Sequence, residues 1–150
     1  MKKVLLAAAL LLLTRFAFAQ TENIKIINTS SCTTYVALKL GDASDKCRPA
    51  YTSSIIAVAP GAILTYNYLT CPGVSTPAQY FNMAKVPDGD PSVCPTSAVD
   101  VGEACVPAPG SNATGQYEFI SSVCTLCGQA NLTWTPDPNP TGTSLLEITP

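Results

Sequence analysis

Residues 53–69 read SSIIAVAPGAILTYNYL, and this stretch decides the fold class. Two runs rich in Ile, Val, Leu, Thr and Tyr, which favour β-strands, meet at Pro60-Gly61. Proline presets the backbone for the second position of a turn, and glycine supplies the positive φ that a type II turn needs next. Tight two-residue hairpins prefer other turn types, so Pro60-Gly61 predicts a wider hairpin or an arch between two sheets. Both alternatives belong to an antiparallel β-domain.

Stretches on both sides of this one also have strand character. In Thr33–Leu40 the side chains of Val36, Leu38 and Leu40 share one face, as alternation along a strand requires. Beyond residue 20 the sequence has no helical periodicity of useful length. Seven or eight short strands predict an all-β fold, an antiparallel β-sandwich stabilised by disulfides, with a small β-barrel as the alternative. The other predicted strands are Asn23–Asn28, Ala78–Val86, Gln116–Val123, Asn131–Thr135 and Ser144–Thr149.

Two segments between the predicted strands are polar. Gly41–Thr52 reads as a loop, and Pro87–Gly115 is dense in Pro, Gly, Ser and Asp. A structureless loop as long as Pro87–Gly115 is uncommon within one domain. We therefore expect a functional loop, a disulfide-tied excursion, or a short strand such as Ala98–Val101 within it.

The first residues have the parts of a secretory signal peptide: a basic start at Met1-Lys2-Lys3, the apolar run Val4–Leu13, and the small-residue site Ala17-Phe18-Ala19. The apolar run is too short to span a bilayer, so no membrane insertion is expected. Residues 1–19 are predicted to be removed, leaving 20–150 as one domain that is secreted or periplasmic. That part has five basic and ten acidic residues, a formal net charge of −5, which argues against nucleic-acid partners.

All seven cysteines follow the predicted signal peptide, as in proteins of oxidising compartments. Cys94 and Cys105 bracket a short excursion, so we expect them to pair. Cys47 and Cys71 flank the two strands around Pro60-Gly61 and would pair in a hairpin, although an arch would weaken this expectation. Cys124-Thr125-Leu126-Cys127 is a C-x-x-C motif. It joins two predicted strands, which favours structural disulfides over redox chemistry. We expect Cys32 to pair with Cys124 rather than Cys127, which leaves Cys127 free or bridging two chains.

The sequence offers few candidate catalytic residues, because the chain contains no histidine. We therefore expect a protein that is not an enzyme and needs no cofactor. A carboxylate-based glycosidase would need a pair such as Glu118 and Glu147, and nothing in the sequence brings these two together. Acidic residues on the Pro87–Gly115 segment could hold calcium, but their spacing differs from an EF-hand and solvated acidic loops are commoner. These calcium candidates are Asp88, Asp90, Asp100 and Glu103.

Aromatic residues recur on strand faces. Tyr66 and Tyr68 share one face, and Tyr117 and Phe119 share another. Pointing outward, they would form a platform for sugar rings; pointing inward, they would be core. The leading hypothesis is a non-catalytic binding or structural module whose partner, a protein or glycan surface, contacts the Pro87–Gly115 loop. A carbohydrate-binding module that uses exposed tyrosines is the alternative.

Three sites match the N-glycosylation sequon, at Asn28, Asn112 and Asn131. They matter only in a eukaryotic secretory pathway, and the short basic signal peptide is more typical of bacteria.

Overall fold

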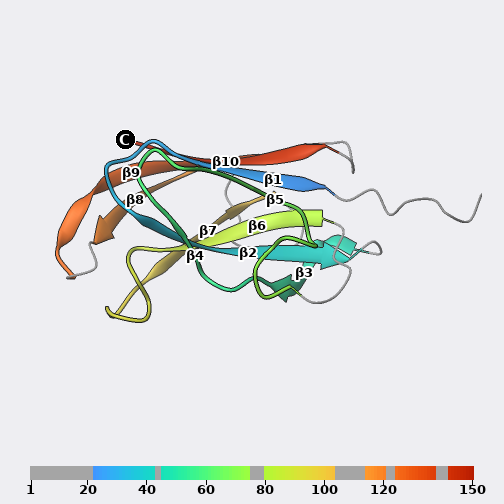
Figure 1. Ribbon diagram of the computed structural model, residues 1–150, viewed down its shortest axis with the longest axis horizontal. Helices are drawn as coiled ribbons and strands as arrows, with labels where there is room; N and C mark the ends of the chain where they lie inside the picture. Colours follow the sequence, from blue (N-terminus) through green and yellow to red (C-terminus); the bar gives the residue numbers. More distant parts are fainter. Residues whose placement is uncertain (1–21, 43–44, 75–79, 104–113, 121–123, 138–141) are drawn as a thin grey trace, which may run out of the picture.

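The computed structural model describes residues 22–42, 45–74, 80–103, 114–120, 124–137 and 142–150. These residues form two packed five-stranded sheets, drawn as an upper and a lower layer in Figure 1. The prediction of an all-β sandwich is confirmed, and the barrel alternative is wrong because the sheets remain separate. The strands are β1 (Asn23–Asn28), β2 (Thr34–Asp42), β3 (Asp45–Thr52), β4 (Ile56–Val58), β5 (Ile63–Tyr66), β6 (Tyr80–Pro87), β7 (Ala98–Gly102), β8 (Thr114–Ile120), β9 (Leu126–Thr135) and β10 (Thr143–Thr149).

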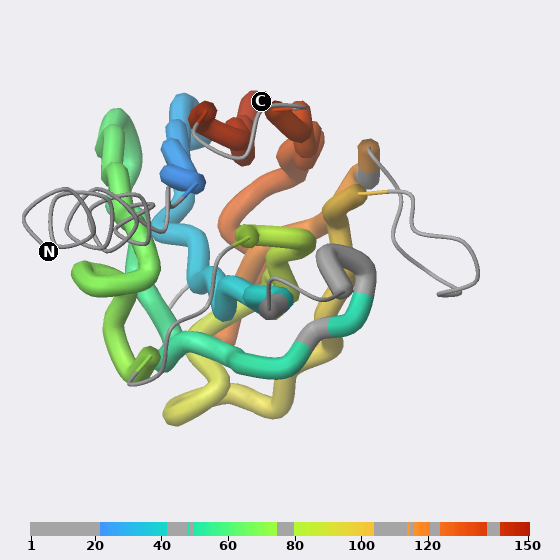
Figure 2. The backbone as a smooth tube through the Cα atoms, turned by 90° about the vertical axis from the view of Figure 1, so that its right-hand side faces the viewer, coloured from blue at the N-terminus to red at the C-terminus, as the bar shows by residue number. Residues whose placement is uncertain are grey.

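The first sheet has the order β5-β1-β10-β9-β8. Its strands are antiparallel neighbours except for β1 and β10, which run parallel with Asn23 opposite Thr143. The second sheet has the order β3-β2-β6-β7, and β4 also pairs with β2. Figure 2 looks along the strands and shows β1 and β10 above β2 and β6. The described residues contain no helix of the length and apolar character that crossing a membrane requires.

The Pro60-Gly61 turn is an arch between the two sheets. It connects β4, which belongs to the second sheet, with β5, which pairs with β1 in the first. Gly61 has a φ of 75°, a left-handed value that glycine adopts without steric cost. The Gly61 amide donates to the Asn28 carbonyl at 2.8 Å, which ties the arch to the end of β1.

The core lies between the sheets, where alternate side chains of each strand point inward. Val36, Leu38 and Leu40 are fully buried, as their shared face predicts. Trp134, Phe81 and Phe119 are the largest buried side chains, and Phe119 comes from the edge strand β8. Burial of this apolar surface is the main stabilising contribution in a sandwich of this size.

Two predictions about loops need correction or refinement. The expected loop Gly41–Thr52 contains β3, whose residues pair with β2 despite their polar character. The expectation of a short strand within Pro87–Gly115 is confirmed, because β7 pairs with β6 there. The rest of that segment, residues 104–113, lies outside the described residues.

The described cysteines form two disulfides, Cys32–Cys127 and Cys94–Cys124, while Cys71 is buried and free. The predicted pairs Cys94–Cys105, Cys47–Cys71 and Cys32–Cys124 are therefore wrong. The Cys47–Cys71 prediction assumed a hairpin, whereas the arch sends β4 and β5 into different sheets and Cys71 is free. Cys105 and the side chain of Cys47 lie outside the described part.

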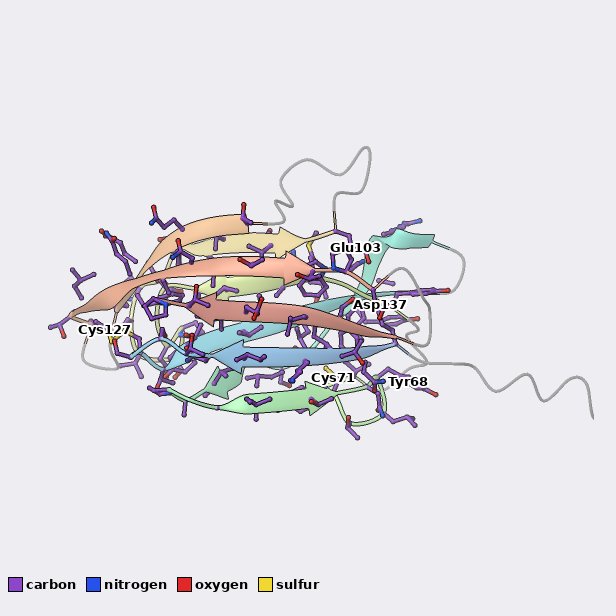
Figure 3. The ribbon with its side chains drawn as sticks, turned by 90° about the horizontal axis from the view of Figure 1, so that it is seen from above. Tyr68, Cys71, Glu103, Cys127 and Asp137 are labelled. Atoms are coloured by element: carbon purple, nitrogen blue, oxygen red, sulfur yellow. A yellow bond between two sulfur atoms is a disulfide. The ribbon has the colours of Figure 1, made fainter. Side chains whose placement is uncertain are left out.

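Both disulfides lie at or just before the start of β9. Cys127 links it to the β1–β2 connection, and Cys124 links the β8–β9 connection to the loop after β6. Figure 3 shows Cys127 at one end of the sandwich, with Cys71 towards the other. Cys124 has a φ of 60°, a left-handed conformation that is uncommon for a residue other than glycine. Two disulfides in one chain suggest an oxidising environment.

Candidate binding site

A pocket of about 320 Å³ lies between the loop that follows β6 and the edge strand β8. The loop, residues 88–97, connects β6 to β7 within the second sheet and turns at the lower left of Figure 1. The pocket is therefore bounded by both sheets of the sandwich. Each described residue that lines it carries a polar group: Asp88, Ser97, Gln116, Tyr117, Glu118 and Gln129.

Hydrogen bonds close the 88–97 loop on itself. The Asp88 amide donates to the Ser97 carbonyl at 3.0 Å, and the Ser97 hydroxyl donates to Asp88 Oδ2 at 2.9 Å. Asp90 Oδ1 accepts from the amide and hydroxyl of Ser92 at 2.9 and 2.6 Å. Hydrogen bonds from Ser92 and the Tyr35 hydroxyl hold the pKa of Asp90 below its ordinary value.

The same loop is fixed to the first sheet. The Ile120 amide donates to the Asp88 carbonyl at 2.6 Å, and the Cys94–Cys124 disulfide crosses nearby. Gly89 sits so close to Ile120 that a Cβ at this position would collide with the isoleucine side chain. Loop and strand edge are thus held together by a covalent bond, a backbone hydrogen bond and close packing. This arrangement gives the pocket fixed walls.

Two oxygen atoms of the pocket are buried without a hydrogen bond of normal geometry to any described residue. They are Asp88 Oδ1 and the Tyr117 hydroxyl. Burial raises the pKa of Tyr117; a hydrogen bond with the Ser97 side chain, outside the normal geometry, opposes this shift, and the charge of Asp88 adds to it. The Tyr117 ring packs edge-on against Phe119, with ring centroids 5.7 Å apart. The core therefore fixes the ring, and its hydroxyl is buried beside the pocket that Tyr117 lines.

The remaining polar side chains of the pocket come from paired residues of β8 and β9. Glu118 lies opposite Gln129, and Gln129 Nε2 donates to Glu118 Oε1 at 3.0 Å. Both side chains are exposed on the outer face of the first sheet. They form the solvent-facing side of the pocket, while Asp88 and Tyr117 form its buried side.

The four calcium candidates do not form one site. Asp88 lines the pocket, Asp90 is bonded within the loop, and Asp100 forms an ion pair with Lys39 at 3.4 Å on the second sheet. Glu103 follows β7, and its amide donates to the Asn82 carbonyl. Within the described ranges no three acidic, cysteine or histidine side chains gather as a metal site would require.

The glycosidase pair considered from sequence is also separated. Glu118 lies opposite Gln129 on β9, whereas Glu147 on β10 lies opposite Thr133. Four residues along a strand and two strand spacings across place the two Cα atoms about 16 Å apart. Glycosidase carboxyl groups stand about 5 to 9.5 Å apart. Glu118 and Glu147 therefore do not form such a pair.

The tyrosines do not form an exposed platform. All six are half-buried, and Tyr66, Tyr68 and Tyr117 pack partly against the core. Figure 3 shows Tyr68 near Cys71, beyond the end of β5. Phe119 is buried outright. The inward alternative for these aromatic residues therefore describes the structure better than the outward one.

The sequon residues differ in accessibility. Asn28 is fully buried, with its side chain bonded to the backbone and to neighbouring hydroxyls, so its amide is closed to modification. Asn131 is exposed on β9, and Asn112 lies outside the described residues.

Sequence reasoning missed Ser97, Gln116 and Gln129 as lining residues. They are ordinary polar residues, and the chain carries no motif that connects them to Asp88. Only the pairing of β8 with β9 and the covalent link of the loop to that hairpin bring them together. The expectation that the Pro87–Gly115 segment contributes to a site depended on its length alone.

No family model, curated protein or solved structure matches this chain. The pocket therefore has to be interpreted from its own chemistry.

Proposed function

We propose that the protein is an exported, non-catalytic binding module, secreted or periplasmic, and that its ligand presents hydroxyl groups to the pocket beside Asp88 and Tyr117. The observation that carries the proposal is that two buried oxygens, Asp88 Oδ1 and the Tyr117 hydroxyl, make no hydrogen bond of normal geometry to a described residue. Nearly all buried polar groups of folded proteins have a partner, and an unsatisfied one costs about 1–3 kcal/mol. Two in one pocket are consistent with groups kept for a ligand.

The chemistry of the lining fits a hydroxyl-bearing ligand. A carboxylate such as Asp88 accepts hydrogen bonds, a tyrosine hydroxyl both donates and accepts, and the amides of Gln116 and Gln129 do both through different atoms. A ligand hydroxyl can donate a hydrogen bond to the carboxylate, and it can donate to or accept from the tyrosine hydroxyl and the two amides. The fixed loop supports binding as well, because walls that are already ordered lose little entropy when a ligand arrives.

One observation favours a second candidate function. Asp88 and Glu118 line the same pocket, and a pair of carboxylates is what glycoside hydrolysis uses. We favour binding because Glu118 is exposed and bonded to Gln129, while Ser97 holds the second oxygen of Asp88. Hydrolysis of a glycan that disappears in Asp88→Asn and Glu118→Gln would replace the binding proposal by this one.

The test is a titration of the labelled mature protein with glucose, galactose, mannose and xylose, followed by amide chemical shifts. At least one sugar is expected to shift signals of residues 88–97 and of β8. Tyr117→Phe and Asp88→Asn should abolish these shifts. Tyr66→Phe and Glu147→Gln make the same chemical changes away from the pocket and should not.

Two results would contradict the proposal. One is the absence of shifts around the pocket for all four sugars. The other is binding that survives in both Tyr117→Phe and Asp88→Asn.

A further inference from the structure

The outer face of the β8–β9 hairpin carries a strip of polar side chains that begins at the pocket. Three cross-strand pairs compose it, and every member is polar. Five of the six side chains are exposed, and Thr133 is partly so. The pairs are Glu118 with Gln129, Gln116 with Asn131, and Thr114 with Thr133. We call these six residues the polar strip.

A second groove, of about 450 Å³, follows the far part of the polar strip. Thr114, Gln116, Asn131 and Thr133 line it together with Leu132. Gln116 lines the first pocket as well. The two hollows therefore share a wall and form one path along the hairpin.

From this path we propose that the ligand is an extended, uncharged polysaccharide chain, one unit of which occupies the pocket while further units lie along the polar strip. The inference rests on the proposed function and names its ligand class. Successive pairs on one strand face repeat about every 6.8 Å. A regular array of donors and acceptors suits a polymer of hydroxyl-bearing units better than a single small molecule.

The composition of the polar strip separates a glycan from other partners. Stable protein interfaces centre on buried apolar or aromatic anchors, and none of the six residues is of that kind. Nucleic acids and other polyanions need basic side chains, and the only charged member is Glu118. Amide and hydroxyl side chains both donate and accept, as sugar hydroxyls do. A carboxylate at the pocket end disfavours acidic polysaccharides.

The proposal is tested by electrophoresis of the mature protein through gels containing β-glucan, xylan, mannan or polygalacturonate. At least one neutral polymer should retard the protein, and the acidic polymer should not. With oligosaccharides of the retarding polymer, affinity should rise about tenfold or more from the monosaccharide to the hexasaccharide, as additional hydrogen bonds form.

The double variant Thr114→Ala/Thr133→Ala changes a cross-strand pair that lines the second groove and not the pocket. It should lower hexasaccharide affinity about tenfold and leave monosaccharide binding unchanged. Its matched control is Lys25→Ala/Thr65→Ala, a cross-strand pair on the same sheet at the β1–β5 side, which should bind as the wild type does. Circular dichroism of both variants checks that they fold.

The outcomes separate the two proposals. Affinity that does not depend on chain length, or a double variant without effect, would overturn the polysaccharide inference while pocket binding stands. Equal retardation by polygalacturonate, or no retardation by any neutral polymer, would also overturn it. Loss of monosaccharide binding in Asp88→Asn tests the pocket by itself.

Discussion

Asn28 and the pocket at Tyr117 are two polar regions within the same sandwich, and they differ in whether their buried polar atoms are hydrogen-bonded within the protein. Asn28 Nδ2 donates to the carbonyls of Cys32 and Val58, both at 2.8 Å, and contacts Thr34 Oγ1 at 3.3 Å. Its Oδ1 accepts from the amide and hydroxyl of Ser30. Every hydrogen-bonding atom of this side chain is used within the protein.

The pocket is built from equally well-fixed elements, yet Asp88 Oδ1 and the Tyr117 hydroxyl make no hydrogen bond of normal geometry to a described residue. The difference teaches how to distinguish two roles of a buried polar group. A side chain that satisfies all its atoms internally joins strands and stabilises the fold. Unsatisfied atoms lower stability, and proteins tend to retain such groups where function uses them.

The largest expected effect comes from Asn28→Ala. The substitution leaves the carbonyls of Cys32 and Val58 without this donor in a buried site, so we expect a loss of roughly 3–4 kcal/mol in the free energy of unfolding. Urea denaturation measures it, and Asn131→Ala on the exposed face is the control. A loss near that of the control would break the distinction between the two regions.

Removing the disulfide of the pocket wall is expected to have the next largest effect. In the chain-entropy model a cross-link across 30 residues contributes roughly 3.5 kcal/mol, so Cys94→Ser/Cys124→Ser should lower stability by about that amount. It should also weaken sugar binding, because the 88–97 loop loses its covalent link to the hairpin. Unchanged binding in this variant would show that the hydrogen bonds alone hold the wall.

The Cys71 thiol is an intermediate case, because it is buried and a hydrogen bond with Ser53 stabilises it only in part. Burial raises its pKa from 9.0 to about 11, and a hydrogen bond with Ser53 acts in the opposite direction. The pKa of the Cys71 thiol is higher in the folded protein than in the unfolded chain, so its stabilising contribution, that of the protonated thiol, is complete below pH 9. It is lost as the pH rises towards 11.

We therefore expect wild-type stability to fall by roughly 2 kcal/mol more than that of Cys71→Ala between pH 9 and 11. Unfolding curves of both proteins across this range measure the difference. Parallel pH profiles of the two proteins would show that the thiol is not desolvated as its position indicates.

The smallest effect is expected for Tyr117→Phe. The substitution keeps the packing against Phe119 and removes a hydroxyl that makes no hydrogen bond of normal geometry to a described residue, so stability should change by less than about 1 kcal/mol. Thermal denaturation measures it, with sugar binding followed in parallel. A marked loss of stability would place Tyr117 with Asn28 as a structural group.

Much of the fold followed from alternation and turn residues. The inward face of Val36, Leu38 and Leu40 was read directly from residue spacing, and most predicted strands match observed ones within a few residues. β3 was missed because it is polar and contains Pro49, so pairing with β2 rather than its own composition makes it a strand.

The disulfides and the site could not be predicted in the same way. Pairing Cys94 with Cys105 assumed that closure is local, whereas the structure places Cys94 against the β8–β9 connection. Asp88 was selected as an acidic loop residue without its true neighbours. Its contact with Ser97 and its place beside Tyr117 depend on how the two sheets pack, which spacing along the chain does not encode.

The parallel pair of β1 and β10 has a consequence for how long the chain takes to fold. Asn23 lies opposite Thr143, so an interior ladder of the first sheet joins the first described strand to the last. Contacts between distant segments lose chain entropy before they gain packing, and folds rich in them form slowly. During synthesis β1 has to wait for β10, so this sheet is completed only after residues 143–149 have emerged.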